Sequence, residues 1–264
     1  VVLGTTACGK SGLGVELARR FNGEIVSADP RQVYKGLDLG TGKVTEEEME
    51  GVPHHMLDVV EPNQPYSVAD FQAGAYAAID DILARGRTPF LVGGTGLYVR
   101  AVTEGFTFTD ARPDPALRAE LEGKTTEELY ALLREKTGVT LTGGEENNRH
   151  RLMRSVEKAL SGRWESPPPC PRYDCLLLGV TFPREEVCRR IDARLQARID
   201  AGMLDEVAEL RANGATDEFL EGLGLEYRYI LRYLTGQIPT LDGLKDVLGR
   251  AIKRFAKRRL VWFK

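Results

Sequence analysis

The chain has 264 residues, of which 42% are hydrophobic, and its formal net charge at pH 7 is −3. This composition indicates a globular protein with a sizeable core and excludes a polycation, so a nucleic-acid partner would have to be bound by a local basic patch. The sequence has no apolar run near the ~20 residues of a membrane span and no signal peptide, so we expect a cytoplasmic protein with no membrane partner. Its four cysteines show no C-x-x-C pairing, which is typical of reduced thiols.

The first distinctive stretch is a glycine-rich turn between an apolar run, residues 1–3, and a helix expected over residues 12–21. It matches the phosphate-binding loop G-x-x-x-x-G-K-[ST], in which glycines let backbone N–H groups wrap around a phosphate. Lys10 adds a point charge, and the Ser11 hydroxyl can ligate Mg²⁺. The eight positions are Gly4, Thr5, Thr6, Ala7, Cys8, Gly9, Lys10 and Ser11. The pattern predicts a phosphate or diphosphate site without saying whether the phosphate is transferred or leaves.

A second buried strand is expected over residues 24–29, and it ends in Asp29. Parallel α/β sheets bind ligands at the carboxyl ends of their strands, so Asp29 is expected near the phosphate, with a turn or capping role as the alternative. His54 and His55 follow soon after. We favour packing and hydrogen bonding over a metal site for them, because Asp58 is the only plausible further ligand nearby.

Residues 67–85 predict an amphipathic helix with Ser67 as N-cap and Asp70 at position N3. Residues 89–92 predict a buried strand, which opens into a second glycine-rich turn over residues 93–96. This strand lacks the terminal aspartate with which many P-loop ATPases hold Mg²⁺. The absence favours a small transferase over an ATPase motor.

Strand patterns disappear between residues 110 and 162, and helices are expected over residues 113–122, 126–137 and 148–160. We interpret residues 110–162 as a helical insertion domain in a core domain made of residues 1–109 and 163–264. The last of these helices is rich in basic residues, for which an anionic ligand and a solvated face both remain open. They are Arg149, Arg151, Arg154 and Lys158, with Arg163 nearby.

Residues 173–182 predict a strand that returns to the sheet, and residues 184–213 predict a helical stretch with Arg190, Arg194 and Arg198 four positions apart. The last helix, expected over residues 240–262, lies in a segment with a strong excess of basic residues. Such an excess predicts contact with a polyanion, with a solvated basic helix as the alternative. The fold class we expect is α/β, with a P-loop NTPase-like parallel sheet core and a helical insertion domain.

Several strings, in order over nearly the whole chain, resemble the tRNA dimethylallyltransferase family, which prenylates N6 of the adenosine next to the anticodon. The matching strings are residues 4–11, 27–41, 51–55, 66–71, 93–98, 151–154 and 255–259. The C-terminal zinc finger of the eukaryotic members does not occur in this sequence, so we expect a bacterial-type enzyme.

The resemblance implies roles for the residues of the loop and of the strand ends. In this family the loop binds the diphosphate of dimethylallyl diphosphate, with Mg²⁺, rather than ATP. Residues 4–11 would hold the diphosphate, Ser11 would bind the metal, and Lys10 and Arg194 would neutralise the leaving group. Asp29 corresponds to the general base that hydrogen-bonds the adenine N6 amine, and Thr95 corresponds to a threonine near the reacting groups.

The resemblance also implies how tRNA is bound. A stacked base hides its exocyclic amine, so the adenosine has to flip out of the anticodon loop into a pocket. The basic last helix would hold the backbone of the anticodon stem. The other tRNA-binding residues implied are Asp29, Pro30, Arg31, Gln32, Thr95, Arg151, Arg154 and Arg228. We expect a monomer whose partners are the tRNA anticodon stem-loop and dimethylallyl diphosphate.

The chain departs from the family pattern at Thr5, Cys8, the pair Asn148-Arg149 and Glu226, which stands where most members have glycine. Three rival hypotheses remain open. A P-loop small-molecule kinase and an adenylate prenyltransferase acting on AMP, ADP or ATP would both function without a long anionic partner. A non-catalytic, nucleotide-gated RNA-binding module would function without Asp29.

Overall fold

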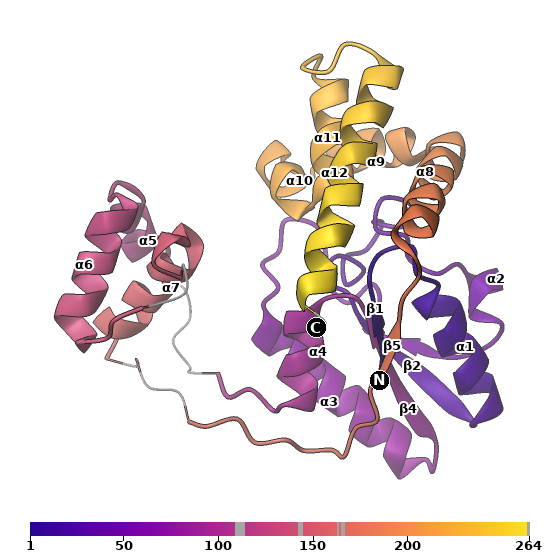
Figure 1. Cartoon of the computed structure of the whole chain (residues 1–264), viewed down its shortest axis with the longest axis horizontal. Coiled ribbons are helices and arrows are strands. Elements are labelled where there is room, and N and C mark those ends of the chain that lie inside the picture. Colours follow the sequence, from indigo (N-terminus) through magenta and orange to yellow (C-terminus); the bar gives the residue numbers. More distant parts are fainter. Residues whose placement is uncertain (109–113, 142–144, 163, 165–166, 263–264) are drawn as a thin grey trace. The chain divides into compact units, whose positions relative to one another are not determined.

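The computed structural model describes residues 1–108, 114–141, 145–162, 164 and 167–262. The chain divides into two compact units, one made of Val1–Glu104 with Pro171–Lys264 and the other of Gly105–Cys170 (Figure 1). The second unit extends beyond the segment 110–162 at both ends. Among the described residues, none of the helices combines the length and the apolar character that a bilayer crossing requires.

A five-stranded sheet, parallel in all its pairings, forms the centre of the first unit, with the strand order β3-β2-β4-β1-β5. The strands are β1 (Val2–Gly4), β2 (Gly23–Ala28), β3 (His54–His55), β4 (Thr88–Gly93) and β5 (Leu178–Val180). The strands expected over residues 24–29 and 89–92 are confirmed as β2 and β4. The strand expected over residues 173–182 is wrong in length, because β5 lies at an edge and pairs only with the three residues of β1.

Helices cover both faces of this sheet. Successive side chains of β2 point to opposite faces, so neighbouring residues pack against different helices. Ile25 packs in one cluster with Val15 of α1 (Lys10–Arg20). Val26 packs in another with Phe71 of α3 (Val68–Ala84) and Val99 of α4 (Gly96–Thr103). Helix α3 starts with the expected capping box of Ser67 and Asp70, and the short α2 (Glu46–Met49) has its own. These helices leave the carboxyl ends of the strands open.

Five further helices gather beyond the carboxyl ends of the strands, above the sheet in Figure 1. They are α8 (Arg184–Asp200), α9 (Met203–Ala212), α10 (Asp217–Leu223), α11 (Leu225–Leu234) and α12 (Leu241–Trp262). Their shared core includes Ile191, Tyr227 and Leu248, and it takes in Leu37 from the segment that follows β2. The single helical stretch expected over residues 184–213 is wrong, because Gly202 adopts a left-handed φ of 98° and separates α8 from α9.

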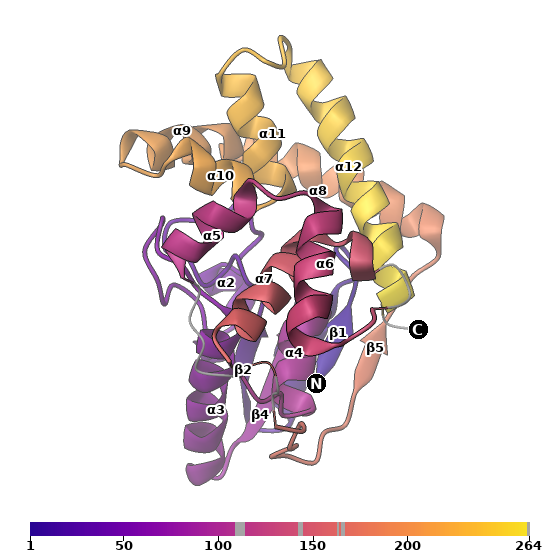
Figure 2. The ribbon, with the colours of Figure 1, turned by 90° about the vertical axis from the view of Figure 1, so that its left-hand side faces the viewer.

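The second unit is helical (Figure 2). It contains α5 (Pro115–Glu122), α6 (Thr126–Thr137), the 3₁₀ turn η1 (Glu145–Asn147) and α7 (Arg149–Leu160). The expected helix over 126–137 is confirmed. The helix expected over residues 148–160 begins at Arg149, because Asn148 is its N-cap. For the helix expected over residues 113–122, Pro113 lies outside the described residues. Leucines 121, 129, 133 and 152 form its core, so this unit has a hydrophobic interior of its own.

Candidate active site

A pocket opens at the carboxyl ends of β2 and β4 and encloses about 970 Å³ of empty space, counting its open mouth. Its walls come from the loop before α1 and the start of that helix, from strands β2, β3 and β4, from the segment after β2, and from helices α8, α11 and α12. All of these belong to the first unit. Ligands of parallel α/β sheets bind at this edge.

The loop between β1 and α1 forms the floor of the pocket with an anion-binding geometry. Ala7 and Gly9 have φ angles of 60° and 79°, a left-handed pattern that turns successive N–H groups toward one point. No side chain among the described residues caps the N-terminus of α1, and its first turn holds no acid. The partial positive charge at this helix end is therefore available to an anion.

Five cationic side chains and two carboxylates line the pocket. The cations are Lys10, Arg31, Arg194, Arg198 and Arg259, and the carboxylates are Asp29 and Glu226. Two of the arginines are hydrogen-bonded to hydroxyls near the strand ends: Arg194 donates to Thr6 Oγ1, and Arg259 Nη2 donates to Thr95 Oγ1 at 3.3 Å. The pocket therefore carries an excess of positive charge at the open helix end.

Burial makes this positive charge costly. It lowers the pKa of Lys10, an effect that Cys8 and Asp29 oppose and the neighbouring arginines reinforce. Burial also lowers the pKa of Arg194 to about 10, with Arg198 adding repulsion. The pKa of Arg259 is lowered for the same first reason. The attraction of a bound anion would offset both the cost of desolvation and the repulsion among the cations, so the cluster is suited to a multiply charged anion.

Glycines allow two of these arginines to reach the pocket. A Cβ atom at Gly94 would lie 2.6 Å from Nη1 of Arg259 and 3.0 Å from the carbonyl oxygen of Gly4. A Cβ atom at Gly42 would lie 1.5 Å from Nη2 of Arg198, and Gly42 has a φ of 64°. Any side chain at these positions would displace the arginine beside it.

Asp29 follows the last residue of β2, and its Oδ1 accepts the backbone N–H of Arg31 at 3.0 Å. The Gln32 amide lies nearby, with Oε1 accepting from the Ser27 hydroxyl at 2.9 Å and Nε2 donating to the Gly42 carbonyl at 3.1 Å. This side of the pocket therefore offers a carboxylate beside an oriented amide, a combination suited to a polar planar group.

Apolar side chains complete the lining between these polar regions. They are Ile25, Val44, Val92, Leu225, Ile252 and Phe255. The pocket thus combines an anion site, an apolar surface and a carboxylate. That combination is suited to a substrate whose hydrocarbon part is attached to a phosphate group.

The structure brings most of the residues singled out in the sequence together. Thr6, Lys10, Ser11, Asp29, Arg31, Gln32 and Arg194 line the pocket. Gly4, Thr5, Ala7, Cys8 and Gly9 belong to the loop at its floor, Pro30 follows Asp29, and Thr95 is reached through Arg259. Two of the pocket cations, Arg198 and Arg259, are not among the site residues named from the sequence. The four-residue spacing between Arg194 and Arg198 was the available signal for the first of them.

Three arginines named from the sequence are not among the residues that line this pocket. Arg228 donates to the carbonyl oxygen of Glu221 at 2.8 Å. Arg151 and Arg154 lie on α7 of the second unit, where Arg154 pairs with the buried Glu157 at 3.0 Å. Their neighbour Arg149 donates to the carbonyl of Glu122 at the end of α5, which gives it a structural contact.

The expected hydrogen-bonding role of the two histidines is confirmed. His54 Nδ1 lies 2.8 Å from the Val52 carbonyl oxygen, and His55 Nε2 lies 2.6 Å from Oε2 of Glu24. Within the described part of the chain, no group of three or more His, Cys, Asp or Glu side chains is arranged to hold a metal ion. Ser11 and Asp29 remain as oxygen donors at the pocket.

Comparison with known proteins gives consistent matches. The family model described as IPP transferase matches residues 32–264, and one described as isopentenyl transferase matches residues 1–61. The tRNA dimethylallyltransferase 2 of Shewanella sediminis is 43% identical over 267 residues, which cover 100% of this chain and 88% of that protein. The tRNA dimethylallyltransferase of Oceanobacillus iheyensis is 39% identical over 279 residues, covering 100% of this chain and 87% of that protein.

Solved structures agree with these matches. The tRNA isopentenylpyrophosphate transferase of Bacillus halodurans superposes with a TM-score of 0.71 at 38% identity, covering 99% of this chain and 84% of that one. A eukaryotic dimethylallyltransferase acting on tRNA superposes with a TM-score of 0.81 at 27% identity, covering 99% of this chain and 68% of that one.

Proposed function

The chain belongs to the IPP transferase family and has its P-loop NTPase-like core, and on this premise we propose how it works as a tRNA dimethylallyltransferase. It transfers a dimethylallyl group from dimethylallyl diphosphate to N6 of the adenosine next to the anticodon in tRNA and releases diphosphate. The observation that carries this proposal is the pocket, in which an anion site, an apolar surface and the Asp29 carboxylate lie together.

The diphosphate occupies the anion site. The N–H groups of the loop from Gly4 to Ser11 surround it, while Lys10 and Arg194 neutralise the charge that grows on it as the C–O bond breaks. Arg198 of α8 and Arg259 of α12 add further positive charge at the pocket. The Ser11 hydroxyl and the diphosphate oxygens form a donor set that suits Mg²⁺, which would supply further positive charge to the leaving group.

The adenine enters beside Asp29. A bond forms between N6 and C1 of the dimethylallyl group while the bond from C1 to the diphosphate oxygen breaks. Asp29 takes the proton that N6 loses, and the apolar side chains keep water away from the allylic carbon. Thr95 is held near the diphosphate by its hydrogen bond from Arg259.

The tRNA is held by positive charge outside the pocket as well as inside it. On α12, Lys257 and Arg258 are exposed and do not line the pocket that Arg259 lines, so they are available to the phosphates of the anticodon stem. Arg151, Arg154 and Arg228 are the further contacts we assign to tRNA. Pro30, Arg31 and Gln32 contact the flipped adenosine and its neighbours.

The two nearest rival activities fit less well. A small-molecule kinase has no use for six apolar side chains beside its phosphate site. For an adenylate prenyltransferase, the isopentenyl transferase model matches only residues 1–61, whereas the IPP transferase model matches residues 32–264.

Label transfer distinguishes these activities. The protein is incubated with dimethylallyl diphosphate labelled in its hydrocarbon part and either tRNA or AMP, and separately with γ-labelled ATP and tRNA. We expect label in tRNA from the prenyl donor alone. Label in AMP, or phosphate transferred from ATP, would contradict the proposal.

A further inference from the structure

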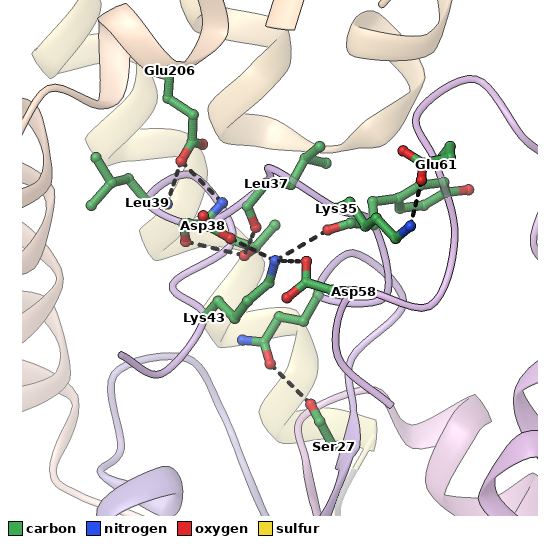
Figure 3. A network of polar contacts seen from close by, with 12 residues as sticks. Ser27, Lys35, Leu37, Asp38, Leu39, Lys43, Asp58, Glu61 and Glu206 are labelled. Atoms are coloured by element: carbon green, nitrogen blue, oxygen red, sulfur yellow. Dashed lines mark hydrogen bonds and ion pairs between the residues drawn. The ribbon is translucent and has the colours of Figure 1, made fainter. Parts of the chain in front are cut away.

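The segment between β2 and α2 carries one wall of the pocket, because Gly40, Thr41 and Gly42 line it. This segment has no helix or strand of its own to hold it in place. Hydrogen bonds within the segment and to other parts of the chain fix its course, and Figure 3 shows some of them. We call residues 38–43 the wall loop.

Glu206 of α9 holds the first half of the wall loop. Its Oε2 accepts the backbone N–H groups of Asp38 at 3.0 Å and Leu39 at 2.6 Å, and its Oε1 accepts the N–H of Gly40 at 3.0 Å. The Tyr227 hydroxyl donates to the same Oε1 at 2.8 Å. Four donors thus converge on one carboxylate. Three are backbone N–H groups of the loop, which lies 166 or more residues away along the chain, and the fourth is the tyrosine hydroxyl of α11.

Lys43 holds the second half. Its side chain is only 6% exposed, and Nζ donates to Asp38 Oδ1 at 2.6 Å and to the Tyr34 carbonyl at 3.1 Å. Asp58 accepts a third bond from the same nitrogen. The wall loop is therefore fixed at both ends, with Gly42 pressed against Arg198 between them.

The wall loop in turn fixes the Gln32 amide. A carbonyl oxygen only accepts hydrogen bonds, so the Gly42 carbonyl requires the nitrogen of the amide to face it. The Ser27 hydroxyl then donates to the amide oxygen. One N–H and one lone pair of the amide remain for the pocket, which Gln32 lines. This free donor and acceptor match an edge of adenine, which presents one acceptor, N7, and one donor, the N6 amine.

We propose that Glu206 is a positioning residue for the acceptor base: by holding Asp38–Gly40 it places the Gly42 carbonyl that orients the Gln32 amide. The inference rests on the proposed function, because the oriented amide serves the adenine of tRNA. Glu206 touches no substrate, and it acts through a loop and a side chain that do.

The test is a double-mutant cycle on kcat/KM for tRNA. In Glu206→Gln, an NH₂ group replaces one oxygen and faces backbone N–H donors. We expect a fall of about tenfold, equivalent to ~1.4 kcal/mol, with most of the change in KM for tRNA and little in KM for dimethylallyl diphosphate. In a Gln32→Ala background the same substitution should change kcat/KM by less than about twofold, because Glu206 acts through Gln32.

Matched variants separate positioning from folding. Glu209→Gln makes the same substitution on an exposed residue of α9 and should leave every parameter at its wild-type value. Tyr227→Phe removes one of the four donors and keeps the ring, so it should give a smaller fall than Glu206→Gln. Amide hydrogen exchange of Asp38, Leu39 and Gly40 should quicken about tenfold in Glu206→Gln, while the loop at residues 4–11 keeps its protection.

Two results would overturn the inference while leaving the proposed function intact. One is additivity, in which Glu206→Gln lowers kcat/KM equally with Gln32 present and absent. The other is a fall in kcat with both KM values unchanged, as expected when only the folded fraction shrinks. Failure of the wild-type protein to prenylate tRNA would remove the proposed function itself and this inference with it.

Discussion

Strand β2 carries one carboxylate near its start, Glu24, and a second immediately after its end, Asp29, and the charges around the two are arranged differently. Glu24 is 1% exposed and accepts hydrogen bonds from Arg85, Arg87 and His55. The Arg85 guanidinium is the main reason that the pKa of Glu24 lies far below its usual range, against the effect of burial. At this end each carboxylate oxygen has cationic partners.

At the Asp29 end the balance is reversed. Five cations face two carboxylates, and burial lowers the pKa values of Lys10, Arg194 and Arg259. Paired charge here marks a structural cluster, while a buried excess of one sign marks a site for a ligand of the other. If the two ends divide stability and activity in this way, substitutions at Glu24 should affect stability and substitutions at the Asp29 end should affect activity.

The largest expected effect is at Asp29. Asp29→Asn removes the proton acceptor without changing the shape of the side chain, so kcat should fall about 10²–10⁴-fold, with tRNA affinity little changed. Single-turnover prenylation and tRNA binding measure the two quantities. Asp205→Asn, an exposed residue of α9 outside the pocket lining, is the control and should keep wild-type turnover. Turnover near wild type in Asp29→Asn would remove Asp29 from the mechanism.

The next effect is at Lys10. Lys10→Met keeps the length and loses the charge, so kcat/KM for dimethylallyl diphosphate should fall about 10²–10³-fold. Because burial disfavours the charged lysine, the variant should unfold at a temperature no lower than that of the wild type. Thermal unfolding with and without diphosphate measures both effects. A diphosphate-induced rise in Tm as large as that of the wild type would argue against an anion site at Lys10.

Glu24→Gln should show the opposite pattern. It breaks a buried ion cluster whose arginines are partly exposed, so the free energy of unfolding should fall by about 2–3 kcal/mol while kcat of the folded enzyme stays unchanged. The folded-state pKa of Glu24 is depressed, so its stabilisation is present above its unfolded pKa of ~4.3 and is lost as pH falls below that value. Denaturant unfolding of the wild type and of Glu24→Gln should therefore show a difference in the free energy of unfolding at pH 7, and this difference should become smaller below about pH 4. A difference independent of pH would contradict the assignment of the effect to this carboxylate.

The smallest effect concerns the outer face of α12. Replacing Lys257 and Arg258 by Gln should weaken tRNA binding and flatten the slope of log K against log salt by about 1–2. Arg250→Gln is the matched control, because Arg250 already pairs with Asp246 and should contribute little to the slope. Equal slopes for the double variant and the wild type would reject the assignment of this face to tRNA.

Features set by local pattern could be predicted from the sequence. The loop over residues 4–11 and the strand that precedes Asp29 depend on neighbours in the chain, and both occur where they were expected. The length of β5 depends on its partner β1, which has only three residues. The local pattern of residues 173–182 contains no information on that partner, so the sequence could not predict how short β5 is.

Arg259 of α12 is an example of a site residue that was not predicted from the sequence. Arg258 and Arg259 are adjacent in the sequence, yet the first is exposed and the second lines the pocket. Arg259 lies seven residues after Ile252, two helical turns along the same buried face, so helical periodicity contained the signal. The role of Glu206 had no such signal, because the loop residues that it holds lie 166 to 168 residues away in the sequence.

Whether the phosphate site holds a leaving group is decided with dimethylallyl diphosphate that carries one label in its hydrocarbon part and another in its phosphates. The protein is incubated with this donor and tRNA, and the tRNA is separated from the small molecules. We expect the hydrocarbon label in tRNA and the phosphate label in free diphosphate, in equal amounts. Phosphate label retained on tRNA, or diphosphate released without prenylated tRNA, would contradict this expectation.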